Sequence, residues 1–412
     1  MPGAALRSSG TDAQNAGSNG EARAETGAQG ESAALQPLVT ANRQPTHPGM
    51  SEIRVLAEDD VPATAALFAR VYPQYRWHSQ AACEAYFREM LFGNPWCDPE
   101  LPSWVAEQDG SIVGVQTVMP RPMRFQGRPL RVAVSCQFMV DPDKRRSLTA
   151  LQLIKAYLSG PQDLSLADGA SNQARHLWIS LGGIAPLLYS LHWTRPLRPA
   201  RYALSLLEEH AALPAALTFA ARPVAALADA LSARMPPNRF FREDHDLAED
   251  NLDPATMLSH LPEVMGGKAL QPVYDAGSLA WLLEQIGRKT RHGALRSRAV
   301  FDSERRFIGW YLYFLNAGGV SEIVQVAAAD GSFDSVLRRL LADAWHHGSA
   351  AVRGRLDPHF AQELSTRHSW FRREGTWTLV HSRHADITTA IHRGDACLSR
   401  LEGEWWLRFQ GG

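Results

Sequence analysis

Cysteine is scarce in this sequence, and neither sign of charge dominates it. The four cysteines, Cys83, Cys97, Cys136 and Cys397, include no C-x-x-C pair. This spacing argues against a disulfide framework and a cysteine-based zinc site, and it predicts a reducing, cytoplasmic location. The 42 basic and 43 acidic residues leave a formal net charge of −1, so the overall charge favours neither nucleic acid nor an anionic membrane as a partner.

Long apolar runs are also missing. No run approaches the roughly 20 residues that a membrane-spanning helix needs, and the N-terminus lacks the apolar core of a signal peptide. Residues 1–50 contain no aromatic side chain and are rich in Ala, Gly, Ser, Gln and Asn. Such a segment cannot bury enough apolar surface to offset its chain entropy, so we predict a disordered extension there. The remaining length suffices for two or three domains of roughly 150 residues.

A strand, a basic turn and a helix follow one another between residues 133 and 158. The strand Ala133–Val140 is apolar and ends before Pro142, which cannot donate to a strand ladder. Ser147 or Thr149 can cap the helix that follows. A helix N-terminus beside cations is a favourable site for an anion such as a pyrophosphate. The cations of this turn are Lys144, Arg145 and Arg146.

The flanking sequence extends this pattern. Asp109-Gly110 and Gln126-Gly127 indicate the tips of two hairpins, and a strand and a helix precede them. A strand, a helix that starts at Ser171 or Asn172, and a further strand over Leu187–Trp193 follow the basic turn. The predicted order from about Ser51 to Ala200 is β-α-β-β-β-α-β-α-β.

This order and this turn resemble the GCN5-related N-acetyltransferase (GNAT) superfamily. Its acyl-CoA turn has the form Q/R-x-x-G-x-G/A; Arg145 and Ala150 fit the ends, whereas Leu148 replaces the central glycine. The resemblance implies acetyl-CoA or another acyl-CoA as co-substrate. A second family segment, N-x-x-A-x-x-x-Y/W-x-x-x-G-F, is matched loosely by Asn172, Ala174, Trp178, Leu181 and Gly182.

A second, degenerate copy of the pattern runs from about Tyr274 to Phe409. Its turn carries Asp330 and Asp334 and no cation, so it should repel a pyrophosphate, and we place the cofactor in the first copy. An Ala/Leu-rich connector broken by prolines should form short helices, and 242–253 should be a solvated acidic loop. We therefore predict a mixed α/β (α+β) fold of two GNAT-like sheets flanked by helices. The expected boundaries are 1–50, 51–200, 201–273 and 274–412.

The resemblance also implies roles for individual residues. A backbone N–H of the cofactor strand should meet the thioester carbonyl, and Tyr189 should protonate the departing thiolate. The alternative for Tyr189 is a core tyrosine whose hydroxyl satisfies a backbone group. The expected cofactor-binding residues are Phe138, Met139, Val140, Lys144, Arg145, Arg146, Ser147, Leu148, Thr149, Ala150 and Asn172.

The general base is harder to place. Some family members carry a glutamate on the cofactor strand, but the matching position here is close to Val134, which has no basic group. Glu322 stands near that position in the second copy and is the first candidate. Glu107 and Asp98 are alternatives that could act through water. Cys136 is expected to be a core cysteine, because no histidine is placed to activate it.

The resemblance implies a cytoplasmic N-acyltransferase that moves an acyl group, expected to be acetyl, from acyl-CoA to an amine. The acceptor would be a small molecule or an amino sugar, with no nucleic-acid, membrane or metal partner, and the oligomeric state is not predicted. Two alternatives stay open. One is aminoacyl transfer from tRNA onto cell-wall precursors, against which the near-neutral charge weighs. The other is a non-catalytic CoA-binding or scaffold protein.

Overall fold

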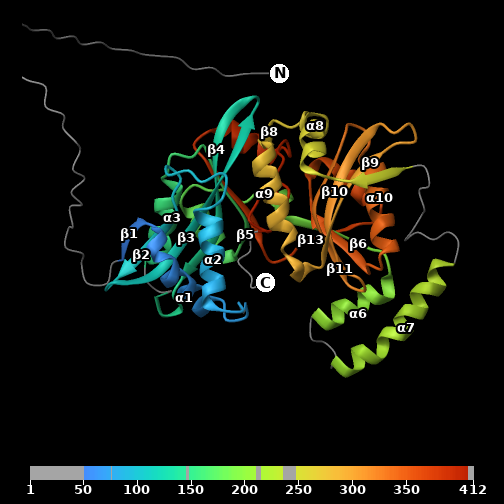
Figure 1. Ribbon diagram of the computed structural model, residues 1–412, viewed down its shortest axis with the longest axis horizontal. Coiled ribbons are helices and arrows are strands. Elements are labelled where there is room, and N and C mark those ends of the chain that lie inside the picture. The colour runs from blue at the N-terminus through green and yellow to red at the C-terminus, as the bar shows by residue number, and fades with distance from the viewer. Residues whose placement is uncertain (1–50, 76, 145–147, 210–214, 235–246, 407–412) are drawn as a thin grey trace, which may run out of the picture. The chain divides into compact units, whose positions relative to one another are not determined.

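The computed structural model describes residues 51–75, 77–144, 148–209, 215–234 and 247–406, which form two seven-stranded mixed sheets (Figure 1). The predicted extension 1–50 and the turn residues Arg145, Arg146 and Ser147 lie outside the described residues. Across the first sheet the strands are β1 (Glu52–Val55), β2 (Trp104–Gln108), β3 (Ser111–Phe125), β4 (Arg128–Val140), β5 (Leu164–Ala170) and β14 (Trp377–Ser382), and β8 (Leu270–Pro272) pairs with β3.

Two tight turns build the centre of the first sheet. Asp109 and Gly110 have φ of 54° and 74°, and Gln126 and Gly127 have φ of 50° and 83°. Two successive left-handed residues match the twist of an antiparallel hairpin. These turns join β2 to β3 and β3 to β4, so both predicted hairpins are confirmed.

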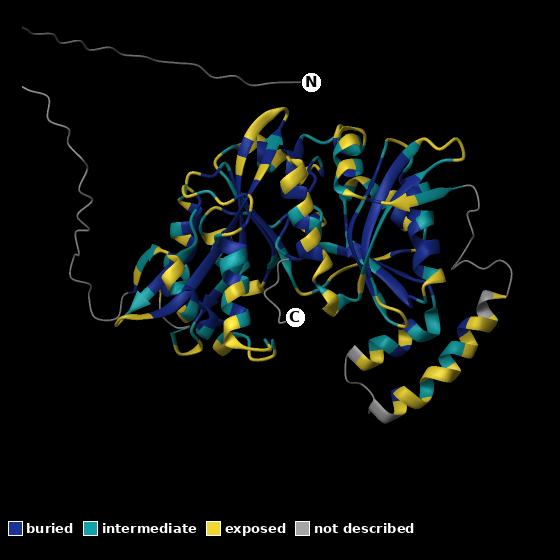
Figure 2. Cartoon of the chain, viewed as in Figure 1, coloured by how far each residue is buried: buried dark blue, intermediate teal, exposed yellow. Residues whose placement is uncertain are grey.

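Helices cover both faces of the first sheet. Val132, Val134 and Cys136 of β4 pack in the core that α1 and α2 complete, whereas Ala133 packs with α3 and α4. Because neighbouring side chains of a strand point to opposite faces, the two helix pairs lie on opposite sides of the sheet. Figure 2 shows the buried strands between these layers. The helices are α1 (Val61–Val71), α2 (Gln80–Leu91), α3 (Thr149–Leu158) and α4 (Asn172–Ser180).

The second sheet is built in a similar way. Its antiparallel strands β9, β10 and β11 are followed by helix α10 (Phe333–His346) and by β12, which runs parallel to β11. In spatial order its strands are β13 (Trp370–Arg373), β6 (Leu191–Pro196), β12 (Ala351–Arg355), β11 (Val320–Ala328), β10 (Phe307–Leu315), β9 (Ala294–Phe301) and β7 (Ala248–Asn251). The remaining helices are α5 (Leu187–Ser190), α6 (Pro199–Glu209), α7 (Ala215–Ala233), α8 (Pro254–Met265), α9 (Ala276–Gly287), α11 (Ala361–Thr366) and α12 (Ala385–His392).

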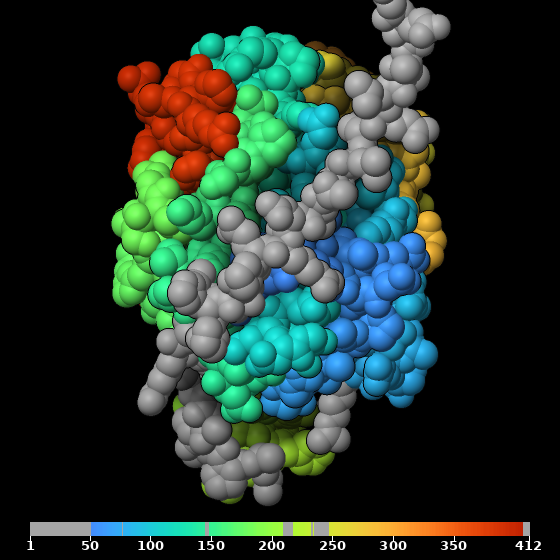
Figure 3. All heavy atoms as spheres, turned by 90° about the vertical axis from the view of Figure 1, so that its left-hand side faces the viewer, coloured from blue at the N-terminus to red at the C-terminus, as the bar shows by residue number. Residues whose placement is uncertain are grey.

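The two sheets exchange strands. β6 follows the elements of the first sheet in the chain, but it pairs with β12 and β13 in the second sheet. β14 belongs to the late part of the chain and pairs with β5 in the first sheet. Figure 3 shows red residues near the end of the chain against green and teal residues of the first sheet's region. The expected boundary at residue 200 therefore does not separate the two sheets.

Several sequence-based expectations differ from the structure. The single strand expected over Leu187–Trp193 begins only at Leu191, because Pro186 begins a short helix over Leu187–Ser190 and accepts a hydrogen bond from the Ser190 hydroxyl at 3.0 Å. The strand expected around Thr376-Trp377 is two strands, β13 and β14, which lie in different sheets. The acidic segment expected as a loop contains the edge strand β7, and its Glu249 accepts a hydrogen bond from Tyr311 at 2.7 Å.

The connector forms two helices, α6 and α7, as predicted, although Pro223 lies inside α7 instead of ending it. A proline leaves one carbonyl of the preceding turn without its helical partner. That carbonyl belongs to Phe219, which is exposed and can be hydrated. None of the helices in the described ranges is both long and apolar enough to span a bilayer.

Candidate active site

The first sheet opens between its two parallel strands. β4 and β5 pair only over Val132–Val134 and Leu164–Leu166. The two strands diverge beyond these residues, toward the C-terminal ends of both. The gap between them is the first cleft. The C-terminal edge of parallel strands is where ligands bind in many α/β folds.

A β-bulge lies on β4 at the start of this gap. Phe138 pairs with Gln116 and Ser135 pairs with Val118, so two residues of β4 oppose Thr117 alone. The hydroxyl of Thr117 accepts the backbone N–H of Gln137 at 2.8 Å, which holds the extra residue in place. A bulge bends a strand and turns its backbone groups to new directions. Here it occurs at the point where β4 turns away from β5.

The cleft contains a cavity of about 300 Å³. Phe68 of α1 and the following Tyr72 and Tyr75 line it from one face of the sheet, and Ala174 and Trp178 of α4 line it from the other. The cavity therefore crosses the sheet through the gap between β4 and β5. Two substrates could enter from opposite faces and meet at the bulge.

The end of the described chain reaches into this cavity. Glu404 lines it, and its Oε1 accepts the backbone N–H of Gly169 on β5 at 3.0 Å. The backbone N–H of Glu404 donates to Asp168 Oδ1 at 2.8 Å, and Arg355 Nη2 of the second sheet donates to Asp168 Oδ2 at 2.7 Å. Sequence reasoning missed Glu404, because no motif surrounds it and it lies 235 positions after Gly169.

Two more polar groups of the cavity limit its chemistry. Burial raises the pKa of the Cys136 thiol well above its usual range, so this cysteine stays protonated and is a poor nucleophile. The side-chain amide of Gln116 is fully buried and donates to Thr117 O and Ser135 Oγ, both at 2.9 Å. Its Oε1 has no hydrogen-bond partner within the described residues, so it could accept an N–H from a ligand.

The expected cofactor-binding residues of β4 differ in position. Phe138 lines the cavity, whereas the side chains of Met139 and Val140 are buried in apolar clusters. The role expected for Met139 and Val140 concerned their backbone and does not depend on this packing.

The turn after β4 is described only at its two ends. Lys144 ends a 3-10 helix, and Leu148 directly precedes α3. Leu148 is 63% exposed, so its side chain is not packed in the core. Thr149 is buried with its hydroxyl 2.8 Å from that of Ser51, and Ala150 packs at the edge of an apolar cluster beside Val113 and Val140.

Asn172 occupies the first turn of α4. Its Oδ1 accepts the indole N–H of Trp377 at 2.7 Å, and Ser171 caps the helix by accepting the backbone N–H of Ala174 at 3.2 Å. Asn172 thus joins α4 to the exchanged strand β14. This contact gives it a structural function beside the cofactor contact predicted from the sequence.

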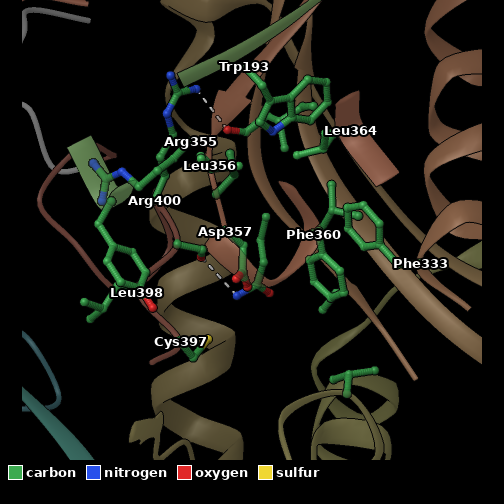
Figure 4. Close-up of a pocket in the computed structure, with 18 of the residues that line it drawn as sticks. Trp193, Phe333, Arg355, Leu356, Asp357, Phe360, Leu364, Cys397, Leu398 and Arg400 are labelled. Atoms are coloured by element: carbon green, nitrogen blue, oxygen red, sulfur yellow. Dashed lines mark hydrogen bonds between the residues drawn. The ribbon is translucent and has the colours of Figure 1, made fainter. Parts of the chain in front are cut away.

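Tyr189 lies outside the first cleft. It lines a second cavity of about 60 Å³, drawn in Figure 4, where Trp193, Leu356 and Phe360 of the second sheet's region surround the space. Its hydroxyl donates to the carbonyl of Ala396 at 2.8 Å, and the residue is 1% exposed. Burial raises its pKa above the usual range. The surroundings of Tyr189 favour the alternative, in which it is a core tyrosine. Its catalytic role stays a prediction that its position does not support.

Glu322 also belongs to the second sheet. Arg353 Nε donates to its Oε1 at 2.8 Å, and Arg400 Nη1 donates to its Oε2 at 2.7 Å. Burial alone would raise the pKa of Glu322, but the charges of Arg400 and Arg353 outweigh burial and lower it. A carboxylate held ionised by two guanidinium groups is a weak base.

The alternative bases also form ion pairs. Glu107 accepts from Arg54 Nε at 2.9 Å, and Asp98 lies 3.4 Å from Arg131. The residues that line the first cleft include neither of them.

The turn of the second sheet keeps its acidic character. Asp330 and Asp334 line an opening of about 520 Å³ at the start of α10. Asp334 Oδ1 accepts from Arg367 Nε at 2.7 Å, and this hydrogen bond lowers the pKa of Asp334. Within the described ranges, no three His, Cys, Asp or Glu side chains gather as metal ligands.

Residues 52–161 match the family model of the acetyltransferase (GNAT) domain. The chain carries a GNAT domain. The match runs from β1 past the end of α3 and includes the bulge and the turn that follows β4. The predicted GNAT-type N-acyltransferase and the mixed α/β fold class are thereby confirmed, whereas a degenerate second GNAT repeat stays a prediction.

Solved structures that resemble this chain in fold include the following two. One is a conserved protein of unknown function from Enterococcus faecalis, described as a probable N-acyltransferase, with 10% identity, a TM-score of 0.51, and coverage of 81% of this chain and 72% of that chain. The other is a GCN5-related N-acetyltransferase from Anabaena variabilis, with 9% identity, a TM-score of 0.51, and coverage of 81% and 73%. No curated protein matches this chain.

Proposed function

We propose that this GNAT protein transfers an acyl group, acetyl in the simplest case, from acyl-CoA to the amine of a small molecule or amino sugar in the first cleft. The observation that carries the proposal is the cavity that crosses the first sheet between β4 and β5. Acyl transfer needs a donor and an acceptor to meet with a defined geometry, and holding both in place supplies much of the rate. A cavity open toward both helix layers suits that requirement.

The donor should lie on the face that α3 and α4 cover. The turn at 144–150 leads into the N-terminus of α3, where backbone N–H groups and the helix dipole favour a pyrophosphate. Lys144, Arg145 and Arg146 add positive charge at this turn. The pantetheine arm would then follow the gap between β4 and β5 toward the bulge. A backbone N–H there would polarise the thioester carbonyl.

The acceptor should enter from the face that α1 and α2 cover, beside Tyr72 and Tyr75. Its neutral amine attacks the thioester carbonyl carbon and forms a C–N bond. The C–S bond then breaks, the new amide nitrogen releases one proton, and the CoA thiolate takes up one proton, so CoA leaves as the thiol. The buried Oε1 of Gln116 can accept an N–H from either substrate and help to orient it.

The donor site can be tested by reversing the charge of the turn. Arg145→Glu with Arg146→Glu should weaken acetyl-CoA binding by roughly 1 kcal/mol or more for each charge-assisted hydrogen bond that the variant removes, measured by calorimetry. Arg305→Glu with Arg306→Glu is the matched control, because this exposed pair lies on the β9–β10 turn of the second sheet.

The control pair should bind acetyl-CoA as the unmodified protein does. Equal affinity in both double variants would remove the cofactor from this turn. Binding of acetyl-CoA without release of free CoA in the presence of an amine panel would instead support the non-catalytic alternative.

A further inference from the structure

We infer that the second cavity, which Tyr189 lines, binds a small carboxylate with a short apolar body. The inference concerns the second sheet, so it goes beyond the proposed function and does not depend on it. The family match ends at residue 161 and therefore assigns no ligand to this place.

The second cavity lies where the parallel strands of the second sheet separate. β11 and β12 pair only over Val320–Glu322 and Ala351–Arg353. A bulge follows on β11, where Val324 is the extra residue between Ile323 and Gln325. Ile323 and Val324 both line the cavity but pack in different core clusters, so the cavity extends to both faces of the sheet. The second cavity therefore forms by the same geometry as the first cleft.

Two buried arginines of the lining have N–H groups that need an acceptor. The side chains of Arg355 and Arg400 are 4% and 2% exposed. Asp168 accepts from Arg355 Nη2 and Glu322 accepts from Arg400 Nη1, both at 2.7 Å. The Nε of each arginine has no hydrogen-bond partner within the described residues. A buried polar group of this kind is rare and indicates a bound water, ion or ligand.

The charges of the lining favour an anion as that ligand. Among the described residues that line the cavity, Lys268, Arg355 and Arg400 are cations, and Asp357 is the only carboxylate. Lys268 Nζ donates to Asp357 Oδ1 at 2.9 Å, whereas the carboxylate partners of the two arginines are not part of the lining. A carboxylate has two oxygens that can accept from both guanidinium groups. Such charge-assisted hydrogen bonds offset the cost of moving a carboxylate out of water.

The rest of the lining is mostly apolar, and it sets the size of the ligand. Figure 4 shows Trp193, Leu364 and Phe360 across the space from the two arginines. A water molecule needs roughly 10–15 Å³ of cavity, so a volume of about 60 Å³ has room for about four to six atoms of that size. Propionate is a carboxylate of this size with an apolar body.

Phosphate-bearing ligands such as acyl-CoA do not suit this site. Asp330 and Asp334 line the neighbouring opening at the start of α10. That opening shares Lys268, Phe333 and Phe360 with the second cavity, so a phosphate beside it would meet two carboxylates. The described lining of the second cavity includes neither aspartate. The ligand is therefore a carboxylate without a phosphate.

The test compares propionate with propionamide, a neutral amide of nearly the same shape. A ligand-observed NMR titration of the full chain should give a Kd of about 1 mM for propionate, and the amide should bind more weakly by about tenfold or more. Ala327→Leu places a larger side chain in the lining and should weaken propionate binding by about tenfold or more. Ala228→Leu is the matched control, because Ala228 is exposed on α7 and its substitution should leave propionate binding unchanged.

Val264→Phe is a second cavity variant in case Ala327→Leu does not fold, because Val264 is a half-buried residue of the same lining. It should also weaken propionate binding. No saturable binding up to about ten times the expected Kd would mean that the cavity holds water only, and it would overturn the inference. Equal affinity for propionamide would overturn the assignment of a carboxylate. Unchanged propionate affinity in a folded cavity variant would place the ligand elsewhere and overturn the inference as well.

Discussion

At the scale of single residues, a substitution of Glu322 distinguishes a catalytic role for this residue from a structural one. The sequence places a glutamate near the expected position of the base, but the structure pairs it with Arg353 and Arg400. Glu322→Gln would leave the buried guanidinium group of Arg400 without its carboxylate partner, and Arg353 would keep its ion pair with Glu374. We expect a decrease of roughly 3 kcal/mol or more in the free energy of unfolding, measured by chemical denaturation.

The stability of the protein should depend on pH through the ion pairs of Glu322. The pKa of Glu322 is lowered in the folded state, so these ion pairs stabilise the protein fully above the ordinary glutamate pKa of about 4.3. This stabilisation disappears as the pH falls through the lower pKa that Glu322 has in the folded state. Unchanged stability of Glu322→Gln with a large decrease in turnover would restore the catalytic role predicted from the sequence.

Single residues also show how far prediction from the sequence reaches. The sequence predicts Phe138 as a cofactor-binding residue because the strand, the basic turn and the helix are contiguous in the chain. The structure places Phe138 in the lining of the first cleft's cavity, and its contact with a cofactor stays a prediction. Glu404 could not be found in this way. It reaches the cavity through contacts with Asp168 and Gly169, more than 230 residues earlier in the chain. A sequence motif describes residues that lie close together in the chain, so it cannot predict a contact between residues this far apart.

At the scale of elements, the segment 396–406 connects the end of the chain to the first cleft. Gly403→Ala should displace this segment from β5, because the added methyl group has no room beside Asp168. We expect amine turnover to fall by about tenfold or more, with little change in acetyl-CoA affinity. Steady-state kinetics and calorimetry on one preparation measure both.

Gly287→Ala is the control for that change. Gly287 ends α9, and a Cβ there would meet nothing within 4 Å. This variant should keep both turnover and affinity. Full activity of Gly403→Ala would show that the segment can shift away from Asp168 without loss of turnover. That result would contradict the role given to the contact between this segment and β5.

Elements differ in how far their sequence determines them. The two hairpins of the first sheet were predictable because Asp-Gly and Gln-Gly supply the left-handed residues that such turns need. The partners of β6 and β14 were not predictable. Alternating or continuous apolar residues indicate a buried strand, but they do not say which of two similar sheets receives it. The short helix α5 was missed for a related reason, because brief apolar runs fit a helix or a strand.

At the scale of the whole molecule, the exchanged strands join the two sheets. A chain cut at residue 200 would remove β14 from the first sheet and would leave β6 without β12 and β13. The ion pair between Asp168 and Arg355 crosses the same boundary, and so does the segment that carries Glu404. The second sheet therefore supports the first cleft even though its own turn carries Asp330 and Asp334 in place of cations.

Hydrogen–deuterium exchange with and without acetyl-CoA tests the location of the donor most directly. One acyl-CoA should bind in the first cleft, so acetyl-CoA should slow exchange in peptides covering 136–150 and the start of α4. Peptides covering 325–336, at the corresponding turn of the second sheet, should exchange at the same rate in both samples. Protection confined to 325–336, or no protection in the first cleft at saturating acetyl-CoA, would contradict the account.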